Sequence, residues 1–280
     1  MTHPDLHLHT NASDGQMDAY QLARLVQRAE VTLFSVTDHD TMAVLPAAAD
    51  WADERGLAFL PGVEISTEGD EEVHILGYGV KADDPALNEC FAQMRRDREA
   101  RVRIMGKRLD EMGMHLPVDE IIRQAGDSVG RPHLGRAMQE AGYVGSVSEA
   151  FEKYLGAGKP AYAPRPTPSA EEAIRLLRSR GAVPVLAHPE EYQWPDEKLL
   201  SRLDQWQRAG LMGLEVYHPA NRQRYAFYDQ LARSRGLLVT GGSDFHREND
   251  GHHGQIGETA PAWKNAVRDA WTLYRLVNAN

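Results

Sequence analysis

Residues 33–40 read LFSVTDHD, a short and mostly apolar run that leads directly into an acid, a histidine and a second acid. Upstream, residues 5–9 read DLHLH and predict another strand. Between the two, residues 18–30 have a helical period with Leu22, Leu25 and Val26 on one side. Strands that alternate with helices predict a parallel sheet covered by helices, and the polar residues at the strand ends are candidates for chemistry.

The alternation continues on both sides of a long interruption. Strands are predicted at 5–9, 33–37, 59–65, 73–78, 182–187, 213–217 and 237–241, and helices at 18–30, 41–55, 170–180, 197–208, 221–235 and 263–277. Residues 85–158 contain no convincing strand and predict four helices instead. We therefore expect residues 1–84 and 159–280 to form one β/α barrel, and residues 85–158 to form a helical insertion, or small second domain, carried by the barrel.

Composition excludes several classes of protein. The chain has 280 residues, a net charge of −10 and one cysteine, Cys90. A single cysteine excludes an internal disulfide and a cysteine-rich zinc site. The acidic balance argues against wrapping a long duplex. With no basic-then-apolar leader and no apolar run near membrane length, we expect a cytoplasmic protein.

The sequence has twelve histidines, and several lie with acids at the ends of predicted strands. The nine side chains of interest are His7, His9, Asp14, His39, Glu64, His74, His188, Asp244 and His246. A single histidine of this kind is usually a satisfied core or surface residue. Six imidazoles and three carboxylates at recurring strand ends indicate a metal site at the end of a barrel that commonly holds the active site.

These motifs resemble the PHP (polymerase and histidinol phosphatase) family over nearly the whole chain. The motifs are HLHT (7–10), SDG (13–15), TDH (37–39), GVE (62–64), AHP (187–189) and SDFH (243–246). The resemblance implies an α/β fold, a distorted (β/α)7 barrel with a trinuclear metal centre. It implies a first ligand group of His7, His9, Glu64 and Asp244, a second of Glu64, His74 and His188, and a third of Asp14, His39 and His246, with Glu64 bridging.

The helical insertion, with GRPHL at 130–134, makes the chain similar to the 3',5'-nucleotide bisphosphate phosphatases of that family. The implied reaction is removal of the 3'-phosphate from a nucleoside 3',5'-bisphosphate, such as 3'-phosphoadenosine 5'-phosphate, by a metal-bridging hydroxide. Nitrogen and oxygen ligands suit Mn²⁺, Zn²⁺ or Fe²⁺, two or three per chain, and we expect Mn²⁺. The partner is then a small nucleotide, or a short RNA, with no membrane and no obligate protein partner.

Three alternatives stay open at this stage. The same metals could serve a 5'-to-3' exonuclease on short RNA, or a histidinol phosphatase, which needs no site for a second phosphate. A PHP module without catalysis is the third, but none of the nine positions is lost. Ser243, beside Asp244, could suggest a serine nucleophile, but no nucleophile-elbow signature accompanies it.

Other residues are candidates for catalysis and substrate binding. We assign catalysis to Asp14, His39, Asp244 and His246, and we expect His218, at the end of the strand 213–217, to be a general acid or a substrate contact. Residues 95–108 carry seven basic side chains and two acids. Most of these cations would be a solvated helix face. The predicted substrate contacts are Arg101, Arg131, His133 and Lys159. A base could stack on one of Tyr154, Tyr162, Trp194 and Tyr217.

Overall fold

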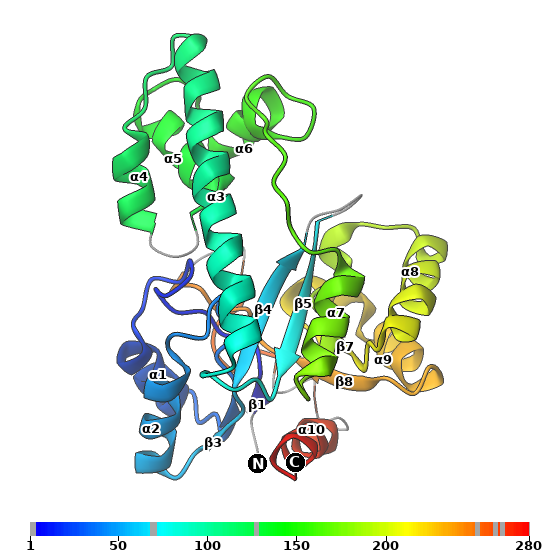
Figure 1. The fold of residues 1–280 in the computed structure, drawn as a ribbon. Coiled ribbons are helices and arrows are strands. Elements are labelled where there is room, and N and C mark those ends of the chain that lie inside the picture. The colour runs from blue at the N-terminus through cyan, green and yellow to red at the C-terminus, as the bar shows by residue number, and fades with distance from the viewer. Residues whose placement is uncertain are drawn as a thin grey trace. The chain divides into compact units, whose positions relative to one another are not determined.

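The structure is a computed structural model that describes residues 4–67, 72–125, 129–249, 253–259, 263 and 267–279 (Figure 1). The chain divides into two compact units. Residues 1–88 and 168–280 form the sheet unit, and residues 89–167 form the helical unit. Each unit is described by itself.

In the described part of the sheet unit, eight short strands form two sheets. They are β1 (Pro4–Asp5), β2 (Leu33–Phe34), β3 (Ala58–Phe59), β4 (Gly62–Thr67), β5 (Val73–Tyr78), β6 (Val183–Leu186), β7 (Gly213–Tyr217) and β8 (Leu238–Gly241). One sheet has the order β1-β2-β3 and is parallel. The other has the order β4-β5-β6-β7-β8. The fold is therefore a mixed α/β fold.

The alternation of strands and helices predicts a wholly parallel sheet, and this prediction is wrong at β5. This strand is antiparallel to both β4 and β6, whereas β6, β7 and β8 are mutually parallel. Only residues 68–72 separate β4 from β5, and a parallel crossover needs a dozen residues or more. The short connection therefore forces the chain to reverse.

The strand predicted at 59–65 is two strands in the structure. β3 pairs with β2, and β4 pairs with β5. Pro61 lies between them, and a proline has no N–H to donate to a continuous ladder. The interruption lets the chain leave one sheet and enter the other.

Isolated bridges connect the edges of the two sheets. His39 pairs with Glu64 in parallel, and Leu8 pairs with Phe245 in parallel. In the described residues no continuous ladder closes the two sheets into one barrel. The bridges nevertheless bring the segments that follow β1, β2 and β8 against β4 and against one another.

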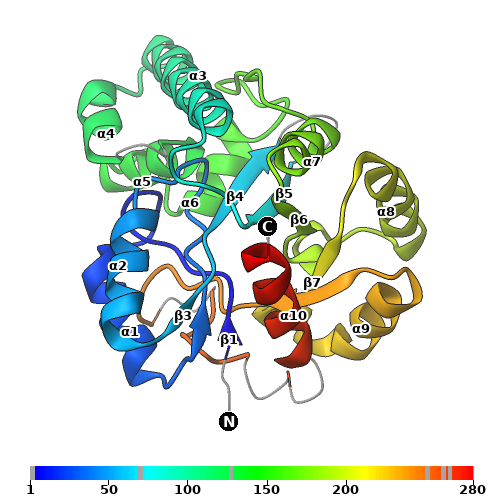
Figure 2. The same cartoon turned by 60° about the horizontal axis from the view of Figure 1, so that its bottom comes forward.

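Helices pack around these sheets. They are α1 (Ala19–Arg28), α2 (Leu45–Arg55), α7 (Ala170–Ser179), α8 (Asp196–Ala209), α9 (Tyr225–Ser234) and α10 (Val267–Asn278), with the 3₁₀ turns η3 (Pro189–Tyr192) and η4 (Pro219–Arg224). Figure 2 shows α1 and α2 beside β3, and α7, α8 and α9 around the larger sheet. Capping boxes begin α1 at Asp18 and α7 at Ser169, and each gives an otherwise unpaired backbone N–H a side-chain partner.

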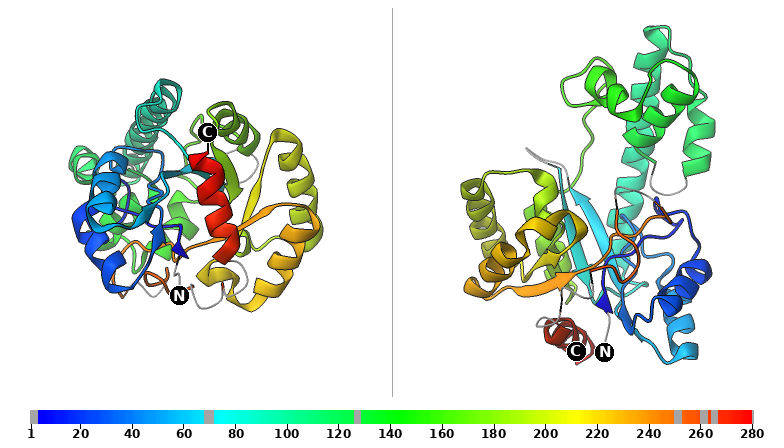
Figure 3. Two further views of the ribbon diagram at one scale, coloured as in Figure 1. Left: turned by 90° about the horizontal axis from the view of Figure 1, so that it is seen from below. Right: turned by 180° about the vertical axis from the view of Figure 1, so that it is seen from behind.

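The last helix lies at the end of the sheets where β5 finishes. Figure 3, in the view from below, shows α10 across this end. Val277 of α10 lies against Gly79, the residue after β5. The core between helices and sheets contains the fully buried side chains of Leu6, Leu33, Val63, Ile75, Val185 and Leu214. This packing leaves the opposite end of the strands for the polar side chains.

The helical unit contains most of α3 (Pro85–Glu111), together with α4 (Val118–Ala125), α5 (Arg131–Glu140), α6 (Val147–Ala150) and a π-helical turn, η2 (Phe151–Leu155). Its described residues have no strand. Its own core includes Met105, Leu134 and Met138. The unit ends at 167, later than the expected boundary at 158, because Ala161 and Ala163 are buried in this core. No helix among the described residues is long and apolar enough to cross a membrane.

Candidate metal centre

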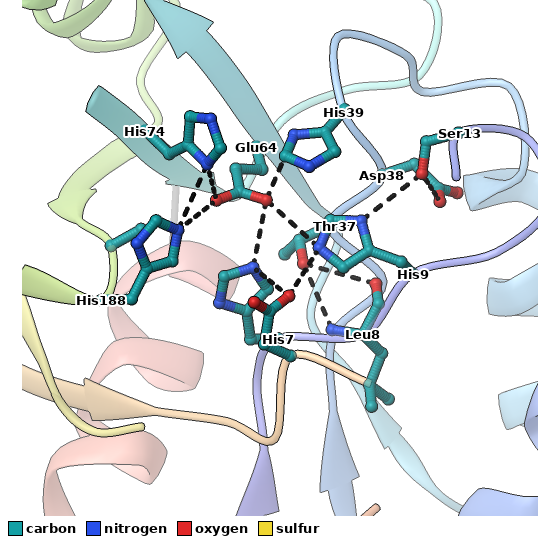
Figure 4. Close-up of polar contacts among 12 residues, drawn as sticks. His7, Leu8, His9, Ser13, Thr37, Asp38, His39, Glu64, His74 and His188 are labelled. Carbon is teal, nitrogen blue, oxygen red and sulfur yellow. Dashed lines mark hydrogen bonds and ion pairs between the residues drawn. The ribbon is translucent and has the colours of Figure 1, made fainter. Parts of the chain in front are cut away.

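All nine predicted ligand side chains lie in the sheet unit, at one end of its strands. His7 and His9 follow β1, His39 follows β2, and Glu64 lies in β4. His188 follows β6, and Asp244 follows β8. Figure 4 shows the Glu64 carboxylate at the centre, with His74 and His188 near one oxygen and His7, His9 and His39 on the other side. His7, His9 and Glu64 are almost completely buried.

The four side chains of the first group have the spacing of a tetrahedral site. The Nε2 atoms of His7 and His9 both lie 3.1 Å from Oε2 of Glu64. They lie 3.3 and 3.1 Å from Oδ1 of Asp244. Four ligand atoms in a tetrahedron about 2.0–2.1 Å from a metal are about 3.3–3.4 Å from one another. The group is therefore nearly shaped to hold an ion.

The second group forms a triangle around the other oxygen of Glu64. Oε1 lies 3.0 Å from Nδ1 of His74 and 3.1 Å from Nε2 of His188. The two ring nitrogens are 3.2 Å apart. His74 opens β5 instead of ending it, and the reversed direction of β5 brings it to this end of the sheet. Each oxygen of Glu64 thus belongs to a different group, as a bridging carboxylate requires.

The third group is looser. Nε2 of His246 lies 3.1 Å from Oδ1 of Asp14, whereas Nε2 of His39 lies 3.8 Å from Oδ2 of Asp14. His9 also approaches Asp14, at 3.8 Å from Nδ1. Nδ1 of His39 is 3.3 Å from Oε2 of Glu64. His39 therefore lies between the third group and Glu64, and the side chain of Asp14 is the most exposed of the set.

Hydrogen bonds at Nδ1 orient two of the imidazoles. Ser13 donates its hydroxyl proton to Asp38 at 2.7 Å, so its oxygen can accept from Nδ1 of His9 at 3.4 Å. The backbone carbonyl of Asp244 accepts from Nδ1 of His246 at 2.9 Å. In a neutral ring, the form that binds a metal, a proton on Nδ1 leaves the lone pair on Nε2. Both rings therefore present Nε2 to the cluster, as metal-ligating histidines commonly do.

The sequence analysis did not identify three residues that lie near the cluster. Asp38 is buried and accepts from the backbone N–H and the hydroxyl of Thr10 as well as from Ser13. Glu215 is completely buried in β7 and contacts His7. His253 stacks on His246 with ring centroids 4.1 Å apart. An acid within an otherwise apolar strand (GLEVY, 213–217) was the available signal for Glu215.

Burial and the neighbouring charges shift the pKa values of the clustered side chains. Burial lowers the pKa of His9, but Asp244 and Glu64 outweigh it and bring it to about 10. Burial likewise opposes Glu64 and other acids at His188, whose pKa rises to about 9. Burial raises the pKa of the Glu64 carboxyl, but the surrounding imidazoles hold it well below its usual range. His39 differs, because burial dominates and lowers its pKa to about 4.

Two buried atoms in the first group remain without a hydrogen bond within the described part of the chain: Nε2 of His9 and Oδ1 of Asp244. They are 3.1 Å apart but are not aligned as donor and acceptor. Unsatisfied buried polar atoms are costly, and coordination to a cation would satisfy both. The donor set, its spacing and these two atoms all fit divalent metal ions that prefer nitrogen and oxygen ligands.

The remaining predicted catalytic residue, His218, lies near the cluster, and so does Ser243. His218 is buried, with Nε2 3.4 Å from Oδ2 of Asp244. Its Nδ1 accepts the backbone N–H of Ala220 at 3.2 Å, so a neutral ring carries its proton on Nε2. Ser243 donates to Asp5 at 2.7 Å and is held in a buried hydrogen bond. This contact counts against the serine nucleophile.

The predicted substrate contacts all lie in the helical unit. Arg101 is buried, its Nε donates to the carbonyl of Ala163 at 2.7 Å, and its guanidinium lies over the ring of Tyr162. Arg131 lies over the ring of Phe151. Nδ1 of His133 accepts the backbone N–H of Gly130, and the side chain is partly buried. Lys159 is exposed.

The aromatic candidates for base stacking belong to both units. Tyr154 packs against the core of the helical unit. Tyr217 is buried beside Trp263, and Trp194 lies under the amine of Lys198.

The chain is similar to enzymes that act on phosphate esters. No family model matches it. A 5'-3' exoribonuclease Rnm from Salmonella typhimurium is 34% identical over 251 residues, which cover 87% of this chain and 85% of that protein. A 3',5'-nucleoside bisphosphate phosphatase from Chromobacterium violaceum is 32% identical and covers 92% of both chains.

A solved structure from Bifidobacterium adolescentis, described as a metal-dependent phosphoesterase, agrees with this fold. Its TM-score is 0.75 and its identity 30%, covering 93% of this chain and 95% of that one. Together with the ordered motifs and the clustered ligand set, these relatives show that the chain belongs to the PHP family of metal-dependent phosphoesterases.

Proposed function

We propose that this chain removes the 3'-phosphate from nucleoside 3',5'-bisphosphates, such as 3'-phosphoadenosine 5'-phosphate, at a trinuclear Mn²⁺ centre. The observation that carries the proposal is the Glu64 carboxylate, whose two oxygens each lie at about 3 Å from the nitrogen atoms of a different ligand group. The similarity to a 3',5'-nucleoside bisphosphate phosphatase over 92% of both chains supports the substrate class.

We also infer that the two sheets act as one distorted seven-stranded barrel. The bridges His39–Glu64 and Leu8–Phe245 join the extensions of β2 and β8 to neighbouring strands. The N–H of Leu6 donates to Gly241 at 3.2 Å, which extends the contact between β1 and β8. A closed arrangement accounts for side chains from six strands meeting at one end.

The residues of the site divide into holding and proton-transfer roles. When bound, divalent metals supply Lewis acidity and a water of lowered pKa. The side chains of three ligand groups would hold the ions: His7, His9, Glu64 and Asp244; Glu64, His74 and His188; and Asp14, His39 and His246. Hydrolysis forms a bond between a water oxygen and phosphorus and breaks the bond between phosphorus and the 3'-oxygen, and the departing oxygen needs a proton. His218, with its proton on Nε2, is our candidate to supply it.

The helical unit is the proposed substrate cap, and its basic side chains are the proposed site of the second phosphate. Arg101 is held on one edge by the carbonyl of Ala163 and on one face by Tyr162. This leaves its orientation defined before substrate arrives, and a guanidinium suits bidentate binding of phosphate. Arg131, His133 and Lys159 complete the proposed set.

A second candidate function is 5'-to-3' exonuclease activity on short RNA. The observation that favours it is the 34% identity to the 5'-3' exoribonuclease Rnm over 87% of this chain. Both reactions would use the same metals and the same nine side chains. They differ in the substrate, which is a single nucleoside bisphosphate for the phosphatase and a chain of nucleotides for the exonuclease.

An assay with Mn²⁺ that measures both phosphate release and mononucleotide release tests the proposal directly, because an exonuclease releases nucleoside 5'-monophosphates and no free phosphate. The substrates are a nucleoside 3',5'-bisphosphate, a 5'-monophosphate, histidinol phosphate and short 5'-phosphorylated RNAs. We expect the bisphosphate to be the preferred substrate. Preference for RNA that increases with its length would favour the exonuclease, and equal rates on all monoesters would refute both assignments.

The Arg131→Ala variant tests the second phosphate site. We expect it to lower kcat/KM for the bisphosphate by about 10–100-fold, the effect of losing one charge-assisted contact, and to change a simple monoester little. Arg136→Ala is the matched control, because Arg136 lies on the same helix and is exposed. Equal losses on both substrates would remove Arg131 from substrate selection.

A further inference from the structure

Glu215 is a completely buried acid at the centre of the strand β7. Its two carboxylate oxygens have different partners. Oε1 lies 3.0 Å from Nδ1 of His7, and Oε2 accepts the backbone N–H of His188 at 2.8 Å. The acid therefore connects a residue of the first ligand group with the backbone of a residue of the second.

Glu215 does not belong to any of the ligand clusters found in the described part of the chain. A carboxylate can only accept from the imidazole, so the contact places the proton of His7 on Nδ1. Nε2 of His7 faces two further carboxylates, those of Glu64 at 3.1 Å and Asp244 at 3.3 Å. With a cation held between these three side chains, the proton stays on Nδ1 and Nε2 would carry the lone pair to the ion. The second contact fixes the backbone at His188, a residue whose φ of 25° is rare for a side-chain-bearing residue.

The geometry points to Glu215 as a positioning residue of the metal centre: it selects Nε2 as the ligating atom of His7 and holds His188 in place. The inference rests on the proposed metal centre and extends it to a residue that would not touch the ions. Hydrogen bonds of this kind to metal-ligating histidines fix the ring orientation and raise the basicity of the ligating nitrogen.

The chemistry of the side chain makes the inference testable with an isosteric change. Glu215→Gln keeps the shape but offers one acceptor and one NH₂ donor, whereas both partners of Glu215 are donors. The N–H of His188 cannot become an acceptor. If the amide oxygen turns to His188, Nδ1 of His7 must accept and the proton moves to Nε2, where it blocks coordination. If the oxygen turns to His7, the N–H of His188 faces the amide NH₂.

The experiment measures Zn²⁺ binding by competition with a chelator, and not only activity. We expect Glu215→Gln to weaken at least one Zn²⁺ site by about 10–100-fold. Excess metal should restore much of kcat, which separates a binding defect from a catalytic one. Asp84→Asn is the matched control, because Asp84 is also a buried acid that accepts from backbone N–H groups but lies outside the cluster. It should leave Zn²⁺ affinity unchanged.

Wild-type protein provides a second test that needs no variant. In the Zn²⁺-loaded protein, NMR of ¹⁵N-labelled histidine should find the proton of His7 on Nδ1, protected from exchange. A proton on Nε2, or unchanged Zn²⁺ affinity in Glu215→Gln, would overturn the inference about Glu215. A wild-type protein that binds neither Zn²⁺ nor Mn²⁺ would overturn the proposed metal centre itself.

Discussion

Replacing Glu64 by glutamine should affect the two ligand groups that share it unequally. The change keeps the shape of the side chain and removes its charge. In the first group Asp244 remains as a second carboxylate, but the second group has no acid other than Glu64. The second group, with His74 and His188, should therefore lose its ion first.

The magnitude follows from the burial of Glu64, whose side chain is 1% exposed. Removing one partner from a buried charge pair costs about 3–5 kcal/mol. Because about 1.4 kcal/mol is a tenfold change in an equilibrium constant, the dissociation constant of the second site should rise at least about 100-fold. The first site should lose less, because Asp244 still neutralises its ion.

The assay is metal content by elemental analysis after dialysis, with chelator competition for the affinity of each site. Glu191→Gln is the matched control. Glu191 lies 3.4 Å from Nδ1 of His188, but its side chain is 31% exposed, so its change should alter affinity less than about 5-fold. Wild-type stoichiometry and affinity in Glu64→Gln would refute the bridging role, and equal loss at both sites would refute the reasoning from Asp244.

Other predictions address packing, pH and metal removal. Gly242→Ala should destabilise the fold by about 1–3 kcal/mol and reduce metal content, because an added Cβ would lie 2.4 Å from the backbone nitrogen of His7; unchanged thermal unfolding would contradict this close approach. Burial raises the pKa of Asp84, but the N–H of Leu87 and the side chain of Arg180 outweigh it and hold it below 3.8. The ionised Asp84 therefore stabilises the fold above pH 3.8, and this stabilisation is lost as the pH falls below that value. The free energy of unfolding, measured with urea at a series of acid pH values, should show this loss in the wild type but not in Asp84→Asn. Removal of metal by a chelator should lower Tm by about 5 °C relative to protein with metal at 100 times its dissociation constant; a Tm that is independent of metal would contradict a site filled only in the folded state.

Much of the candidate site was predictable because its side chains follow apolar runs. His39 and Glu64 could be placed near one another once their strands were recognised, and the isolated bridge joins these two residues directly. Glu215 was overlooked because one acid inside an apolar strand reads as an exposed position. In the structure both faces of β7 are buried, so the acid has to find partners within the protein.

The direction of β5 could not be read from its apolar run, because side-chain alternation is the same in both directions of a strand. Most of the predicted ligands follow the C-terminal ends of strands, but His74 lies near the N-terminal end of β5. The antiparallel pairing of β5 with β4 explains why His74 still lies at the same end of the sheet. The expected boundary near 158 also differed, because Ala161 and Ala163 are small residues whose burial comes from the packing of distant helices. Local periodicity has no information about such contacts.

The sheet unit is assembled from two separated stretches of chain, 1–88 and 168–280, and this has a consequence during synthesis. His7 and His9 leave the ribosome long before Asp244 and His246 exist. At typical elongation rates the delay is roughly 10–50 s. A nascent chain of this enzyme must therefore wait, with its first histidines and acids unpaired, while the intervening helices are made and can begin to fold.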